Sequence, residues 1–241
     1  MILDSVIFSN PGGRDHNEDS AAWKDLPDGG LFVVADGLGG HRYGELASKC
    51  AADCLLGSGG PEANADVREW LQQQFALANE KILGLQAEKN GNMKSTLVAL
   101  MIRGEKAYWA HTGDSRLYYF HRSTLAACTE DHSVAYKKYK AGEITRARIA
   151  QDEDQASLLR VLGNASHFEP DVSEVRDPLE PGDAFLMCTD GVWEYLSDDE
   201  ALVDLLKAET AREWAELLLL RIIARVKPGN DNLSLITVLV R

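Results

Sequence analysis

The sequence predicts an α+β fold built from antiparallel sheets and separately grouped helices. Two observations carry this prediction. Short β-branched or aromatic runs, separated by turn residues, follow one another in the middle of the chain, and segments with helical periodicity flank them on both sides. This order does not repeat a strand–helix–strand unit, so a parallel sheet is not expected.

The first third of the chain is expected to contain two strands followed by two helices. An uninterrupted apolar run at 30–36 is typical of a buried strand. In the longer helix, Val67, Leu71 and Phe75 recur at helical spacing and mark one apolar face. The predicted strands are 4–10 and 30–36, and the predicted helices are 43–56 and 65–89.

The rest of the chain is expected to contain further strands, a polar insert and two more helices. The segments 103–106 and 121–123 have the composition of hairpin turns. Ser197 and Thr210 each precede a glutamate by three residues, which is a capping-box pattern at a helix start. Residues 132–160 are polar and mostly helical in pattern, and we expect an exposed, mobile insert there. The other predicted strands are 95–102, 106–112, 115–121, 124–128, 183–189 and 232–240, and the late helices are 198–207 and 210–226.

The composition is that of a globular protein, and we expect a single domain at 1–241. Lys and Arg number 25 and Asp and Glu number 38, so the net charge is −13. Such a charge repels phosphate backbones and disfavours nucleic-acid binding. The cysteines show no C-x-x-C pattern, and neither a signal peptide nor an apolar spanning run is visible. We therefore expect a cytoplasmic protein without membrane insertion.

The informative residues are acidic and lie outside the helical segments. Asp36 and Asp190 each follow an apolar strand and precede a glycine. An aspartate in this position is held rigidly with little water around it, and several such carboxylates in one place raise one another's pKa. A divalent cation removes that repulsion. The other acidic candidates are Glu18, Asp19, Asp114 and Asp231.

Carboxylate oxygens without a cysteine or histidine cluster favour Mg²⁺ or Mn²⁺ over zinc. A glycine beside the aspartate lets the backbone approach an ion closely. Two ions about 4 Å apart can activate a water and orient a phosphoryl group, whose oxygens Arg14 would hold in a bidentate contact. A single Asp-Gly pair is also a common turn, so the residues alone leave a structural role open.

Taken together, these segments resemble the metal-dependent serine/threonine protein phosphatase family (protein phosphatase 2C, PPM) in its compact bacterial form. The matching segments occur in the family's order and span 13–232. They are GR (13–14), NED (17–19), VADGLGGH (34–41), GELAS (44–48), STLV (95–98), GDSR (113–116), TEDHS (129–133), LG (162–163), DGVW (190–193) and NDN (230–232).

The resemblance implies a centre of two Mn²⁺ or Mg²⁺ ions. Asp36 would bridge both ions. Glu18 and the carbonyl of Gly37 would help to hold one of them, and Asp190 and Asp231 would hold the other. The nucleophile would be the metal-bridging water, so no covalent phospho-enzyme is expected.

The resemblance also implies the fold and the substrate contact. The family fold is two packed antiparallel β-sheets flanked by helix pairs, an α-β-β-α sandwich, and the insert at about 132–165 would be its mobile flap. Arg14 would bind the substrate phosphate. Asp114 with Asp190 would bind a weaker third ion, as described for bacterial members.

The sequence departs from the family pattern at several positions, and two of these departures bear on the chemistry or the substrate. Leu38 stands where animal members carry a histidine proposed as general acid, so another group must protonate the leaving oxygen. His41 is nearby, and we expect it to be structural or to support the site. The acidic run at 151–154 stands where relatives often have a His-Pro and a basic residue, so their substrate preference is not carried over.

The first hypothesis for function is a protein phosphatase that acts on phosphoserine and phosphothreonine in proteins. We expect a monomer that opposes a bacterial serine/threonine kinase. The alternative is a catalytically silent module of the same fold that binds phosphoproteins, and intact Asp36, Asp190, Asp231 and Arg14 argue against it. A metal-dependent nuclease is disfavoured by the net charge of −13.

The remaining histidines and the tryptophans are expected to have ordinary roles. We expect core positions for His111, Trp109, Trp193 and Trp214, a structural position for His132, and surface or turn positions for His121 and His167.

Overall fold

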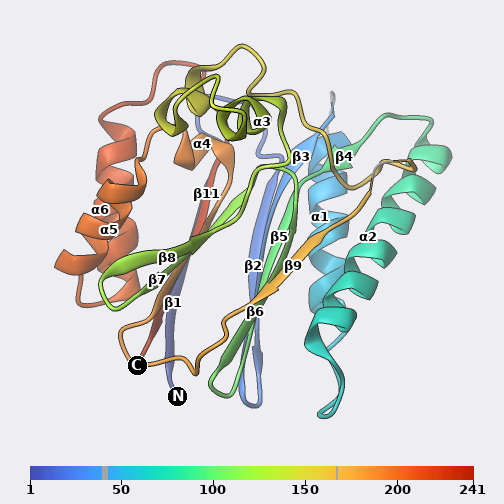
Figure 1. Cartoon of the computed structure of the whole chain (residues 1–241). Helices are drawn as coiled ribbons and strands as arrows, with labels where there is room; N and C mark the ends of the chain where they lie inside the picture. The colour runs from blue at the N-terminus through green and yellow to red at the C-terminus, as the bar shows by residue number, and fades with distance from the viewer. Residues whose placement is uncertain (40–42, 167) are drawn as a thin grey trace.

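The computed structural model describes residues 1–39, 43–166 and 168–241, so His41 and His167 lie outside the described residues. Two antiparallel sheets stack face to face, and helices cover both outer faces (Figure 1). The strand orders are β1-β11-β10-β7-β8 in one sheet and β2-β3-β5-β6-β9 in the other, with the short β4 paired to β3. The predicted two-sheet, helix-flanked α+β fold is confirmed.

The first sheet contains β1 (Leu3–Asn10), β7 (Arg116–His121), β8 (Thr124–Cys128), β10 (Ala184–Cys188) and β11 (Leu233–Val240). The second contains β2 (Asp19–Leu26), β3 (Gly29–Leu38), β4 (Lys94–Ser95), β5 (Leu97–Arg103), β6 (Lys106–Thr112) and β9 (Asp171–Glu174). The helices are α1 (Tyr43–Gly57), α2 (Val67–Lys89), α3 (Val134–Lys140), the 3₁₀ helix η1 (Arg146–Gln151), α4 (Asp190–Trp193), α5 (Asp198–Lys207) and α6 (Ala211–Ile223).

The central strands are mostly apolar because both of their faces are buried. Along β3, Phe32 and Val34 point into the core between the sheets, whereas Leu31 and Val33 point toward α1 and α2. Successive side chains alternate between faces, so a strand with a helix layer on one side and a sheet on the other shows no regular alternation of polar and apolar residues.

Each sheet carries its own helix pair. Helices α1 and α2 cover the second sheet, and α5 and α6 cover the first (Figure 1). Trp214 of α6 is fully buried in this outer layer, and Trp109 and Trp193 are also buried, as predicted. Among the described helices, none combines the length and apolar character needed to cross a membrane.

The predicted helix starts are confirmed, with one difference. Ser197 and Glu200 form a complete capping box at the start of α5. Thr210 accepts the N–H of Glu213 at 3.1 Å, but the Glu213 carboxylate accepts the N–H of Glu209 at 2.7 Å instead of closing the box. The second capping box is therefore only half formed.

Two edge strands, β2 and β9, were not predicted. Their side chains are mostly exposed or half-buried, because each lies at one margin of the second sheet and its polar residues face solvent. The predicted hairpin turns are confirmed: Arg103 pairs with Lys106, and Arg122 and Ser123 both take positive φ, of 48° and 62°.

The insert at 132–165 is less helical than predicted. It contains only α3 and the short η1, joined by turns. Lys138 of α3 links its two parts, since its Nζ lies 2.8 Å from a carboxylate oxygen of Asp152 and of Asp154. The mobility of this insert and its role as a flap stay predictions.

Candidate metal centre

The candidate acidic residues meet at one edge shared by both sheets. In an antiparallel pair, the end of one strand lies beside the start of the other. Asp36, near the end of β3, therefore lies opposite Asp19, the first residue of β2. In the other sheet, β10 ends beside the start of β11, which brings Asp190 and Asp231 to the same edge. In Figure 1 this is the upper edge, where α4 begins.

The carboxyl groups at this edge oppose one another's ionisation. Burial raises the pKa of Asp36 well above its ordinary value. The neighbouring charges that raise it further are those of Asp190, Asp19, Asp114 and Asp231. Burial likewise raises the pKa of Asp190, with Asp231 adding to it, and that of Asp114, with Asp190 adding to it. The structure thus brings the predicted aspartates into one cluster, and a bound cation would relieve its repulsion.

Glycines allow the segments around Glu18 to pack closely. A Cβ on Gly37 would lie 2.1 Å from the carbonyl oxygen of Gly44, and a Cβ on Gly44 would lie 2.8 Å from a carboxylate oxygen of Glu18. The N–H of Gly37 also donates to the Glu18 carbonyl at 3.1 Å. Glu18 and Gly37 therefore lie together. With only oxygen donors in this group, the residues fit Mg²⁺ or Mn²⁺.

Thr96 fixes the backbone of Asp36. The N–H of Asp36 donates to the Thr96 hydroxyl, and the N–H of Thr96 donates to the Asp36 carbonyl, both at 2.9 Å. The same hydroxyl shares a hydrogen bond of 2.7 Å with Ser115, the residue after Asp114. One buried side chain thus ties Asp36 to the turn that carries Asp114.

Arg14 stands at the open side of the cluster. Its Nη2 donates to Asp231 at 2.9 Å, and its side chain is 55% exposed. Asn232 secures the loop that carries it, because its amide nitrogen donates to the carbonyls of Pro11 and His16, both at 2.9 Å. Its amide oxygen accepts the N–H of Glu18 at 2.8 Å. The NDN segment therefore attaches the Arg14 loop to the start of β11.

Buried polar contacts hold the turn of Asp114. Trp193 Nε1 donates to the Asp114 carbonyl at 2.9 Å. The guanidinium carbon of Arg116 lies 3.7 Å from the centre of the Trp193 ring. Arg116 also donates two hydrogen bonds to Asp131, of 2.8 and 2.7 Å. Asp114 is therefore held by residues from both sides of the insert.

Two acidic residues without a predicted role also belong to this region. Asp19 is 8% exposed, and its carboxylate accepts a hydrogen bond from the Thr189 hydroxyl at 2.9 Å. Burial raises the pKa of Asp19 to about 7. Burial, with the charges of Asp190 and Asp231, also raises the pKa of Glu194 to about 7. The sequence signals are weak: Asp19 follows Glu18, and Glu194 stands one helical turn after Asp190.

His111, His132 and Asp171 form a second group, with donor atoms within 4.8 Å of one another. Its hydrogen bonds argue against a metal. Nδ1 of His132 accepts the N–H of Gly113 at 3.3 Å, so Nε2 carries the proton and faces Asp171 at 3.2 Å. The Arg160 guanidinium, 2.8 Å from Asp171, already supplies a cation. His132 therefore has a structural role, as predicted.

Two other histidines, His111 and His121, differ from prediction in detail. His111 is buried, as predicted. Its Nε2 is bonded to the Glu130 carbonyl at 2.9 Å, but its Nδ1 has no partner among the described residues. His121, predicted at a surface or turn, ends β7, and its Nδ1 lies 2.6 Å from the buried Asp183.

The stability of the metal-free protein is expected to fall as pH rises through about 7. Folding raises the pKa of acids such as Asp19, so these groups hold their protons more tightly in the folded than in the unfolded state. Their contribution to the free energy of unfolding is therefore lost as they ionise with rising pH. Bound Mg²⁺ or Mn²⁺ offsets this loss, so the gain in melting temperature on adding metal is expected to be larger near pH 8 than near pH 6.5. Thermal unfolding with EDTA and with each metal tests this. An equal gain at both pH values would contradict it.

Comparison with known proteins shows the family and the fold. The family model for protein phosphatase 2C matches residues 12–216. The serine/threonine phosphatase stp of Listeria welshimeri is 32% identical over 235 residues, covering 93% of this chain and 90% of the relative.

Solved structures show the same fold over the whole chain. The serine/threonine phosphatase of S. agalactiae matches with a TM-score of 0.87 and 26% identity, covering all of both chains. The catalytic domain of the phosphatase PstP in complex with two manganese ions matches with a TM-score of 0.83 and 27% identity, covering 98% of this chain and 97% of that one. By its family match and its relatives, the chain belongs to the protein phosphatase 2C family.

Proposed function

We propose that this protein removes phosphate from phosphoserine and phosphothreonine in proteins, as a metal-dependent hydrolase. The observation that carries the proposal is the convergence of buried and half-buried carboxylates at one sheet edge, with the exposed Arg14 beside them. Such a cluster is unfavourable without a cation, and an arginine beside it suits the oxygens of a phosphate.

The predicted ligands would divide between two Mg²⁺ or Mn²⁺ ions. Asp36 would contact both, Glu18 and the Gly37 carbonyl would hold one, and Asp190 and Asp231 would hold the other. The close packing of Glu18 against Gly37 and Gly44 supports the first set. When bound, such ions lower the pKa of a water and polarise the phosphoryl group.

A weaker third ion is proposed at Asp114 and Asp190. Each raises the pKa of the Asp36 carboxyl, and Asp190 raises that of Asp114, which supports placing a further cation between them.

The chain's own residues bind and orient the substrate. Arg14 would hold the phosphate oxygens, and its contact with Asp231 keeps it aimed at the cluster. Thr96 holds Asp36 in place from the backbone. Leu38 cannot donate a proton, so the leaving oxygen must be protonated by another group.

We further propose that the phosphatase is a cytoplasmic monomer that opposes a serine/threonine kinase. The free cysteines support a reducing compartment, and the net charge of −13 disfavours nucleic acid as a substrate. The alternative, a silent phosphoprotein-binding module, is not favoured, because every predicted ligand is present.

Release of phosphate from a phosphothreonine peptide tests the proposed function. The assay is run with Mn²⁺, with Mg²⁺ and with EDTA. We expect release with either metal and none with EDTA. A folded protein that binds the peptide but releases no phosphate with any metal would support the silent module instead.

Arg14→Ala is expected to raise KM for a phosphopeptide more than it lowers kcat, because a phosphate clamp acts mainly on binding. A roughly tenfold or larger rise in KM is expected for the loss of a charge-assisted contact. Steady-state kinetics with saturating metal measure both constants. Arg212→Ala, at an exposed arginine of α6, is the matched control, and an unchanged KM in Arg14→Ala would remove Arg14 from the site.

A further inference from the structure

A pocket of about 480 Å³ lies beside the metal centre, between the insert and the turn after α4. Residues of η1 form one wall, and the segment from Trp193 to Glu200 forms the other. Trp193 also supports the centre through its hydrogen bond to the Asp114 carbonyl. A peptide whose phosphorylated residue reaches the metals therefore comes within reach of this pocket, which can hold a long side chain.

The pocket is apolar where the stem of such a side chain would lie. Ala147, Ile149 and Ala150 line it on the side of the insert, and Trp193 and Leu196 line the opposite side. The stems of lysine and arginine are aliphatic up to their charged heads, so they pack well on apolar surfaces of this kind.

The positive charges in the pocket are already balanced. Each of its arginines donates two hydrogen bonds, of 2.5–3.1 Å, to a carboxylate. The pairs are Arg116 with Asp131, Arg146 with Asp198, and Arg225 with Glu200. An anionic ligand would have to break one of these pairs.

Two carboxylates in the pocket stay unpaired. Within the described parts of the chain, neither Glu194 nor Asp199 has a cation at ion-pair distance. Asp199 lies in the first turn of α5, where the helix N-terminus stabilises an anion. Glu194 is half-buried and has no such compensation. Glu194 lines the pocket and lies near enough to Asp190 and Asp231 for their charges to act on it, so a cationic head group in the pocket is its natural partner.

We propose that this pocket receives a lysine or arginine side chain of the substrate, so that the enzyme prefers phosphopeptides with a basic residue at one fixed distance from the phosphorylated residue. The proposal rests on the proposed phosphatase function and names a substrate class for it. Apolar walls would bind the stem, and Glu194 would bind the charged head.

A lysine scan tests this preference. A phosphothreonine peptide carries a single lysine at each of several positions on either side of the phosphorylated residue, with alanine elsewhere, and kcat/KM is measured for each peptide with saturating Mn²⁺. We expect one position to raise kcat/KM about tenfold over the alanine peptide, which corresponds to ~1.4 kcal/mol. Glutamate at that position is expected to lower it.

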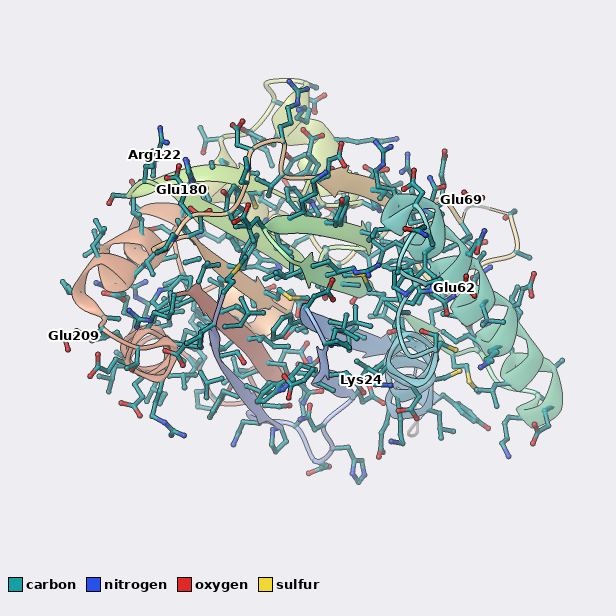
Figure 2. The ribbon with its side chains drawn as sticks, turned by 90° about the horizontal axis from the view of Figure 1, so that it is seen from below. Lys24, Glu62, Glu69, Arg122, Glu180 and Glu209 are labelled. Atoms are coloured by element: carbon teal, nitrogen blue, oxygen red, sulfur yellow. The ribbon has the colours of Figure 1, made fainter. Side chains whose placement is uncertain are left out.

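Two variants test whether the pocket is responsible. Glu194→Gln removes the charge, and Ala147→Trp fills the pocket from the side of the insert. In both, the ratio between the lysine peptide and the alanine peptide is expected to fall toward one. Glu209→Gln is the matched control, because Glu209 projects at the edge of the molecule in the view from below (Figure 2) and lies outside the pocket. In Glu209→Gln, the kcat/KM ratio between the lysine and alanine peptides is expected to stay unchanged.

The outcomes separate this inference from the function. No release from any peptide would overturn the proposed function. Two results would overturn the pocket assignment alone. One is phosphate release with the same kcat/KM for every lysine peptide and for the alanine peptide. The other is an equal gain in kcat/KM at every position, which is what general attraction by the net charge of −13 would give. The pocket assignment would also be overturned if the kcat/KM ratio between the lysine and alanine peptides stayed unchanged in both variants.

Discussion

Asp36→Asn is expected to abolish phosphatase turnover while making the metal-free protein more stable. The Asp36 carboxyl lies among the other aspartates of the cluster, whose charges all raise its pKa, and it is the proposed bridge between the two metals. Substitution of residues that only support a metal ligand costs about 10–100-fold, so loss of this ligand is expected to cost roughly 10³-fold or more in kcat.

The stability change has the opposite sign because the carboxylate is costly in the metal-free fold. Burial and neighbouring charges raise the pKa of Asp36 well above its ordinary value, so near pH 8 its ionised form opposes folding. Asparagine has nearly the same shape without the charge. The melting temperature in EDTA is therefore expected to rise, and the gain on adding Mn²⁺ is expected to shrink.

Activity and thermal unfolding together test the assignment. Asp25→Asn, at an exposed residue near the end of β2, makes the same chemical change away from the cluster and is expected to change neither property. An Asp36→Asn protein that keeps most of its activity would show that the metal assignment is wrong. A loss of activity with lower stability in EDTA would indicate simple damage to the fold.

Asp131→Ala is expected to destabilise the protein by about 3–5 kcal/mol, because it leaves a buried guanidinium without its counter-charge. Arg116 is 5% exposed and Asp131 is 4% exposed. Their two hydrogen bonds join the turn of Asp114 to the base of the insert. For a chain of this size, the melting temperature is expected to fall by about 6–20 °C.

An exposed pair of the same chemistry provides the control. Arg122 and Glu180 are also joined by two hydrogen bonds, but their side chains are 72% and 50% exposed and lie together at the surface (Figure 2). Glu180→Ala is expected to cost less than about 1 kcal/mol. Urea unfolding of both variants measures the difference.

Replacing both Arg116 and Asp131 shows whether the lost stability comes from an unpaired buried charge or from lost packing. The double variant Arg116→Met with Asp131→Leu removes both charges, and such replacements are often close to neutral. It is expected to recover most of the stability lost in Asp131→Ala. Equal losses in Asp131→Ala and Glu180→Ala would contradict the argument that burial decides the energy.

Two of the residues that sequence reasoning found share one property. Asp36 and Asp190 each follow an apolar strand and precede a glycine, and that local pattern marks a rigid carboxylate at a strand end. Asp19 lacks such a pattern because β2 is a polar edge strand. The sequence named Asp19 as an acidic candidate without a role, and its pairing opposite Asp36 places it in the cluster.

Local pattern also decided which helices and strands were predicted. The two-face burial of β3 leaves a run of apolar residues that is visible without a structure. The edge strand β9 is mostly exposed, so its sequence is not constrained by a core and shows no alternation. The insert contains less helix than its pattern indicated, because turns separate α3 from η1, and Lys138 links the two parts by its contact with Asp152.

The sequence by itself determined the fold class, the family resemblance and the candidate metal ligands, because those properties depend on short motifs and their order. Only the tertiary structure decided which charges are neutralised. Arg146 and Asp198 are 52 residues apart in sequence, and their pairing leaves Glu194 unpaired in the pocket. Ion pairing depends on distances between segments that no local pattern encodes, and the proposed substrate preference follows from those distances.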